Sequence, residues 1–313
     1  LLAAVLEALA LAAAVMGDVK AGKGYAMVEE YAEMDRQMWV AQGIRQMYGP
    51  QIDLATDPRW ARNSGTYGEV PEVVSGITTA LVAGYQQGTE GVQLEGVSLS
   101  IKHFPGDGAA ENGYESHTYQ GQWRIYTTPG SLEKYQLVGF QAACDAGVSS
   151  IMPCYSRDTV DPRSVEQSYR GVVIPVDQVG SAYSTTMMQT LLTEAMGFKG
   201  FINTDSGILE TQTFGVETLD YPERYAKLIP MIEVTNETYC LSGVNGRGTP
   251  FFFEDDFCDW SFREAQKYFP GNELIINEAG LEWSVTNAHT NRNPYYQQVE
   301  KLLLELDADV VMT

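Results

Sequence analysis

The sequence predicts an α/β fold in which strands and helices alternate, and a (β/α)8 barrel of the TIM type that need not be complete at its N-terminus. Four strand-like runs each end in a turn-rich segment. Helical patterns fill the intervals, which indicates a parallel sheet. The 313 residues are enough for a barrel of about 250 residues. An open doubly wound sheet is the structural alternative, although no dinucleotide-binding glycine motif or Walker sequence supports it.

The predicted strands recur at a nearly constant interval. Each contains an isoleucine, and these isoleucines are 49, 50 and 51 residues apart. This interval exceeds a minimal strand–helix unit, so we expect an insertion in each unit. The strands span residues 47–54, 97–101, 148–152 and 200–203, with Ile52, Ile101, Ile151 and Ile202 inside them.

The predicted helices each have an apolar face at helical spacing and a glycine that follows as a stop signal. Pro71 is typical of a helix N-terminus, and Ser131 is the expected N-cap of the second helix. The helices span Pro71–Gln87, Leu132–Ala146 and Thr185–Met196, followed by Gly88, Gly147 and Gly197.

The two ends of the chain are less regular. Residues 1–16 are apolar except for one glutamate and predict a core helix or the stump of a longer chain, with no recognisable secretory signal. Beyond residue 221 the alternation weakens, although 295–306 resembles an amphipathic helix and 307–312 a short strand. We expect residues 1–220 to form the main part of the barrel, and 221–313 its end and a following segment.

Charge restricts the partners of this chain. It has 20 Lys and Arg against 41 Asp and Glu, a formal net charge of −21. Such an acidic protein repels phosphate backbones and anionic membranes, so we expect neither nucleic acid nor a membrane as a partner. Uncharged ligands such as sugars are not penalised. The sequence does not predict an oligomeric state.

The sequence predicts no metal and no organic cofactor. None of the cysteines forms a Cys-x-x-Cys pair: Cys144 and Cys154 are expected as buried thiols, and Cys240 and Cys258 as a disulfide or as free thiols. The acidic residues between 254 and 259 lack EF-hand spacing and are interpreted as a solvated turn. A glycosylation sequon begins at Asn236.

Polar side chains follow each predicted strand. In a barrel these carboxyl ends converge on one pocket. A carboxylate ringed by cations, an imidazole and a phenol suits a neutral polyhydroxylated ligand, because forked donors hold several hydroxyls at once. A carboxylate near cations also stays ionised, as glycoside cleavage requires of a nucleophile. The side chains are Arg62, Lys102, His103, Tyr155 and Asp205.

Several stretches together resemble glycoside hydrolase family 3, in the order that the family has them. They are residues 53–62 with 67–71, 102–108, 151–156 and 197–205. The resemblance implies a (β/α)8 barrel, or a variant of one, that cleaves β-linked sugars with retention. By motif, Asp205 matches the nucleophile, while Arg62, Lys102 and His103 match the residues that grip the sugar in the −1 subsite, and Tyr155 matches a pocket tyrosine. Lys102 and His103 can point into one pocket together only through an unusual backbone, such as a cis peptide bond.

The chain also departs from the family pattern. An early substrate-binding aspartate segment is not found, and Ser206 follows the nucleophile where many members have tryptophan. The β-glucosidase branch takes its acid/base glutamate from a second domain, for which Glu273, Glu278 and Glu282 are candidates by position. The β-N-acetylhexosaminidase branch instead uses a histidine after the Lys-His motif, where this chain has Glu115-Ser116-His117. The spacing differs from that branch, so we favour His117 as a pocket-wall residue.

The sequence therefore predicts a retaining β-glycosidase of the β-glucosidase type, acting on a small oligosaccharide or glycoside through Asp205. The first alternative is a β-N-acetylhexosaminidase with Glu115 and His117 as a catalytic pair. The second is a catalytically weak sugar-binding barrel that lacks its acid/base domain. The family resemblance favours a periplasmic or secreted location.

Overall fold

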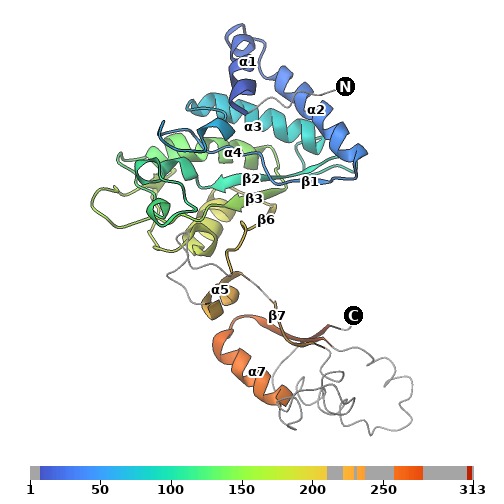
Figure 1. Ribbon diagram of the computed structural model, residues 1–313, viewed down its shortest axis with the longest axis vertical. Coiled ribbons are helices and arrows are strands. Elements are labelled where there is room, and N and C mark those ends of the chain that lie inside the picture. Colours follow the sequence, from blue (N-terminus) through green and yellow to red (C-terminus); the bar gives the residue numbers. More distant parts are fainter. Residues whose placement is uncertain (1–7, 210–220, 229–230, 237–256, 278–308, 312–313) are drawn as a thin grey trace. The chain divides into compact units, whose positions relative to one another are not determined.

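The computed structural model describes residues 8–209, 221–228, 231–236, 257–277 and 309–311 (Figure 1). The chain divides into two compact units, Leu1–Leu219 and Asp220–Thr313. Within the described residues, no helix is long and apolar enough to cross a bilayer.

The first unit is built on a four-stranded parallel sheet with the order β1-β2-β3-β6. Ile101 pairs with Ile151, and Ile151 pairs with Ile202, so the regular isoleucine spacing of the sequence becomes one row across the sheet. The predicted α/β fold with a parallel sheet is confirmed, whereas closure into a barrel stays a prediction. The strands are β1 (Gln46–Met47), β2 (Ser98–Phe104), β3 (Ser150–Pro153) and β6 (Phe201–Ile202).

The first predicted strand is largely wrong. Residues 47–54 do not form one strand, because Pro50 lacks an amide donor. Contact with β2 resumes at an isolated bridge between Gln51 and Lys102. β2 itself runs further than predicted and includes Lys102 and His103.

Helices cover one face of this sheet, with α3 (Pro71–Gln86) and α4 (Leu137–Asp145) closest to it (Figure 1). Two predicted helix ends are corrected. Gln87, with φ of 62°, takes the left-handed position expected of Gly88. Ser131 makes no capping bond, because its own backbone is already helical, with φ of −65° and ψ of −31°, and the N–H of Lys134 donates to the carbonyl oxygen of Gly130 instead.

The remaining elements of the first unit include two N-terminal helices, α1 (Ala8–Lys20) and α2 (Ala26–Ala41). Two π-helical segments replace parts of predicted α-helices, at Leu132–Gln136 and Thr186–Ala195. Short 3-10 turns and a two-stranded hairpin complete the unit: 63–65, 107–109, 111–113, 119–121, 181–183, β4 (Ser168–Tyr169) and β5 (Val172–Val173).

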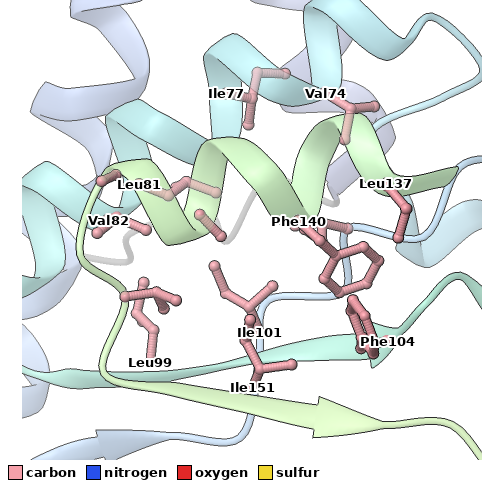
Figure 2. Packing of buried hydrophobic residues seen from close by; sticks show 14 of the residues in the cluster. Val74, Ile77, Leu81, Val82, Leu99, Ile101, Phe104, Leu137, Phe140 and Ile151 are labelled. Atoms are coloured by element: carbon pink, nitrogen blue, oxygen red, sulfur yellow. The ribbon is translucent and has the colours of Figure 1, made fainter. Parts of the chain in front are cut away.

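The core of the first unit lies between the sheet and these helices. Figure 2 shows Leu99, Ile101 and Phe104 of β2 facing side chains of α3 and α4. Phe104 and Phe140 meet edge to face, with ring centroids 5.3 Å apart, and both are fully buried. This packing fixes β2, the strand that delivers Lys102 and His103.

The second unit holds a separate three-stranded parallel sheet with the order β7-β8-β9. The pattern is more regular than the sequence indicated, because a helix links the first two strands. β9 falls within the predicted strand over 307–312. The elements are α5 (Tyr221–Leu228), β7 (Met231–Asn236), α7 (Phe257–Tyr268), β8 (Glu273–Asn277) and β9 (Asp309–Val311).

Some predictions fall outside the described residues. The proposed helix over 295–306, Cys240, residues 254–256 of the predicted acidic turn and the sequon beyond Asn236 lie there, and the side chain of Cys258 is not described. The rest of that predicted turn, residues 257–259, is instead the start of α7. Within the described part, Cys154 is buried and Cys144 is partly buried, and both are free thiols.

Phe140→Ala should lower the free energy of unfolding by about 3–5 kcal/mol, because a fully buried aromatic ring in contact with Phe104 is replaced by a cavity. Urea unfolding followed by circular dichroism measures the change. Leu94→Ala is the control: Leu94 is 92% exposed, so its loss should cost less than about 0.5 kcal/mol. Equal effects of the two substitutions would contradict the described core.

Candidate active site

A buried carboxylate organises the end of β2. Asp53 is fully buried and accepts hydrogen bonds from the backbone N–H of His103 at 3.1 Å and from the N–H of Asp107 at 2.7 Å. It also lies 2.8 Å from His103 Nδ1. Since a carboxylate is an acceptor, Nδ1 carries the proton, and the other ring nitrogen, Nε2, is left on the side of Asp205.

The Lys102–His103 peptide bond is cis, as the sequence argument anticipated. The turn after it depends on glycine. Gly106 has φ of 129°, a conformation that L side chains rarely adopt. A Cβ at Gly108 would lie 2.0 Å from the carbonyl oxygen of Leu54, so only glycine lets these two segments approach. The turn is therefore held against the residues that follow β1.

Asp205 lies beside this arrangement, just beyond β6. Its Oδ2 is 3.9 Å from His103 Nε2, and its side chain is 12% exposed. Its Oδ1 accepts a 2.7 Å hydrogen bond from the N–H of Ser206. One oxygen is thus held by the backbone while the other faces His103.

Lys102 is half-buried next to the same carboxylate. Burial is the main cause that lowers the pKa of its ammonium, and nearby Arg62 acts in the same direction, while Asp205 and Asp53 oppose it. Its Nζ lies 5.6 Å from the centroid of the Tyr48 ring, a weak cation–π contact. A partly desolvated cation of this kind is well suited to hold a sugar hydroxyl.

Glu115 and His117 form a hydrogen-bonded pair in the loop after β2, close enough to Asp205 for its charge to act on His117. Glu115 Oε2 lies 2.7 Å from His117 Nδ1 and accepts the His117 N–H at 2.8 Å, while Oε1 is 3.5 Å from Arg62 Nη1. The bond to Glu115 is the main cause that raises the pKa of His117; burial and Arg62 lower it, and Asp205 adds to the rise. Burial alone would raise the pKa of Glu115, but its bonds to His117 lower it overall.

Tyr155 contacts both His117 and the residue that follows Asp205. Its ring meets that of His117 edge to face, with centroids 4.9 Å apart. Its hydroxyl donates a 2.6 Å hydrogen bond to the carbonyl oxygen of Ser206. Burial, followed by the negative charge of Asp205, raises the pKa of the phenol well above its ordinary value, so the hydroxyl stays protonated.

The structure thus brings together every site residue predicted within the first unit. Of the predicted glutamates, Glu278 and Glu282 lie outside the described residues, and the side chain of Glu273 is not described. Sequence reasoning missed the roles of Asp53 and Asp107; carboxylates at two turn-rich strand exits were the available signal. In the described part of the chain, no three His, Cys, Asp or Glu side chains gather to hold a metal ion.

Comparison with known proteins agrees with this geometry. The family model of the glycosyl hydrolase family 3 N-terminal domain matches residues 6–220. The chain belongs to glycosyl hydrolase family 3. The sequence resemblance to this family is therefore confirmed, and residues 221–313 lie beyond the matched domain.

The curated proteins that this chain resembles include several named as β-glucosidases. β-Glucosidase C of Emericella nidulans is 34% identical over 213 residues, 65% of this chain and 32% of that protein. The periplasmic β-glucosidase/β-xylosidase of Dickeya chrysanthemi is 34% identical over 181 residues, 57% and 26% of the two chains. The structure of Listeria innocua β-glucosidase in complex with isofagomine matches with a TM-score of 0.56 and 24% identity, over 71% and 27% of the two chains. The alignment thus spans about a third of the curated relatives.

Glu115→Gln should lower the pKa of His117 toward the ordinary histidine value, because the variant loses the carboxylate that favours the imidazolium. NMR titration of the His117 ring measures it. Because folding raises this pKa, the stability that His117 contributes is complete below about pH 6.5 and is lost as pH rises through the folded value.

Glu111→Gln is the control for this titration, because Glu111 lies four residues before Glu115 but pairs with Arg163. It should leave the His117 titration unchanged. An unshifted His117 in the Glu115→Gln variant would contradict the described pair.

Proposed function

We propose that this chain carries the catalytic unit of a retaining β-glycosidase that hydrolyses β-linked glucosides through a covalent intermediate on Asp205. The observation that carries the proposal is the position of Asp205, 3.9 Å from His103 Nε2 and close enough to Lys102 to act on its charge. A nucleophile of this class must be ionised and adjacent to groups that hold the sugar. Membership of family 3 supports the same reading.

The reaction takes two balanced steps. In the first, a carboxylate oxygen of Asp205 bonds to the anomeric carbon while the bond to the leaving oxygen breaks, and an acid donates a proton to that oxygen. In the second step, the acid of the first step, now deprotonated, removes a proton from water. The water oxygen bonds to the anomeric carbon while the bond from that carbon to Asp205 breaks. The acid/base group should lie about 5–5.5 Å from Asp205 for retention.

The roles of the other residues follow from their contacts. Lys102, His103 and Arg62 bind hydroxyls of the sugar in the −1 subsite, and Tyr155 forms the wall beside Asp205. Asp53 keeps the His103 ring in one tautomer, so that Nε2 accepts a hydroxyl hydrogen bond. The proton donor of the β-glucosidase reading is a glutamate beyond the matched domain, with Glu273, Glu278 and Glu282 as candidates by position.

We also infer that the sheet closes into a (β/α)8 barrel. The parallel strands follow one another in chain order from β1 to β6, as barrel strands do, and the site lies at their carboxyl ends. The fold likeness to Listeria innocua β-glucosidase supports this inference. The periplasmic relative in Dickeya chrysanthemi favours a periplasmic or secreted location.

A β-N-acetylhexosaminidase is the second candidate. The 2.7 Å contact between Glu115 and His117 favours it, because a carboxylate that orients a histidine makes a competent proton donor and acceptor. In this reading His117, rather than an outside glutamate, protonates the leaving oxygen. Parallel assays with aryl β-glucosides and aryl β-N-acetylglucosaminides distinguish the two enzymes, and azide rescue reveals a missing acid/base group.

Asp205→Ala should abolish covalent trapping by a 2-deoxy-2-fluoro-β-glucoside with an activated leaving group. Such a leaving group needs no proton donor, so the test isolates the nucleophile. Mass spectrometry of the intact chain and of its peptides reads the label. Asp161→Ala is the control, because Asp161 pairs with Arg163. Labelling of the Asp205→Ala variant at the same site would contradict the assignment of Asp205 as the nucleophile.

His117→Ala should reduce turnover by a similar factor for good and poor leaving groups if His117 is a pocket-wall residue, as the β-glucosidase reading expects. If His117 is the proton donor, its loss should instead lower kcat most for poor leaving groups, by about 10²–10⁴-fold. Steady-state kinetics over a series of aryl glycosides measures the slope. A loss of turnover confined to poor leaving groups would identify His117 as the proton donor.

A further inference from the structure

A second buried carboxylate lies behind the site and has no part in the mechanism above. Asp107 is fully buried in the turn that follows β2. Its Oδ2 accepts a 2.7 Å hydrogen bond from Ser116 Oγ, and its Oδ1 accepts one from Ser156 Oγ at 3.1 Å. Its backbone N–H donates to Asp53 at 2.7 Å. The carboxyl group thus uses both oxygens within the protein.

Each of these partners adjoins a wall of the site. Ser116 lies between Glu115 and His117 and is 1% exposed, so its hydroxyl is the inner anchor of that pair. Ser156 follows Tyr155, and it is held from the other side by Arg124, whose Nη1 donates to the Ser156 carbonyl oxygen at 2.6 Å.

We infer that Asp107 is a positioning residue that fixes the Glu115–His117 pair and Tyr155 relative to Asp205, acting through the hydroxyls of Ser116 and Ser156. Asp107 does not reach the substrate, because its side chain is enclosed. Its contribution is to hold Ser116 and Ser156, and with them their neighbours Glu115, His117 and Tyr155, in place. The expected effect of Asp107 on kcat rests on the proposed glycosidase function, whereas its expected effect on the position of the Glu115–His117 pair does not.

The environment of Asp107 explains why both serines are needed. A carboxyl group without solvent requires hydrogen-bond partners, and an unsatisfied one would cost stability. Burial, and then the charge of Asp53, raises its pKa, which the Ser116 hydroxyl and His103 oppose. The hydroxyls therefore satisfy the buried group and draw two chain segments onto it at once.

The test uses Asp107→Asn and Ser116→Ala. A third variant, Ser156→Ala, removes the hydrogen bond between Ser156 and Asp107 and leaves the one from Ser116 in place. Ser131→Ala is the matched control, because it removes a serine hydroxyl that contacts only Gln167 among the described side chains, at 3.4 Å. Thermal melting checks that each variant is folded. The first readout is the NMR titration of His117, which Glu115, Arg62 and Asp205 face. The second is kcat and KM on an activated aryl β-glucoside.

We expect Asp107→Asn and Ser116→Ala to lower the pKa of His117, because a displaced Glu115 holds the imidazolium less well. We expect kcat to fall about 10-fold or more with little change in KM, since a displacement near 1 Å can cost on the order of 10²-fold. Ser156→Ala should lower kcat without moving the His117 titration. Ser131→Ala should change neither quantity.

Two results would overturn the inference. The first is a His117 pKa that stays unchanged in folded Asp107→Asn and Ser116→Ala variants. The second is a kcat loss in these variants no larger than in Ser131→Ala, with the wild-type enzyme active. A shifted His117 pKa in a chain that hydrolyses no glycoside and is not trapped at Asp205 would instead refute the proposed function and leave the positioning role standing.

Discussion

The site depends on a carboxylate that solvent does not reach. Asp53 receives hydrogen bonds from the backbone of His103, the ring of His103 and the backbone of Asp107. A buried anion of this kind is tolerated only when its oxygens are satisfied. The loop that leaves β2 is therefore held in the one path that supplies those donors. The orientations of Lys102 and His103 follow from that path.

The sheet below the site was largely predictable. The regular isoleucine spacing in the sequence corresponds to direct cross-strand pairing of Ile101, Ile151 and Ile202. Buried parallel strands are near-continuous apolar runs, so local sequence is enough to find them. The strand near residue 50 was not predictable in the same way, because Pro50 removes a backbone donor inside a segment that otherwise has strand character.

The elements that sequence reasoning missed carry charges on buried faces. α2 buries Val28, Ala32 and Arg36 in one stripe, and the arginine breaks the apolar pattern. Arg36 is accommodated because it donates to Glu33 and to the carbonyl oxygen of Glu95, 59 residues away. Asp53 is similar, since its partners lie 50 and 54 residues away in the chain. A single residue gives no sign of such partners before the fold brings them together.

The contact between Tyr155 and residue 206 has an evolutionary consequence. The Tyr155 hydroxyl donates to the backbone carbonyl of Ser206, and the Ser206 N–H donates to Asp205. Both bonds use main-chain atoms of residue 206, so any amino acid except proline, which has no N–H to donate, could retain them. Substitution at residue 206 can therefore place new side chains beside Asp205 while the two bonds around that carboxylate are retained. The surroundings of Asp205 can thus change at little structural risk.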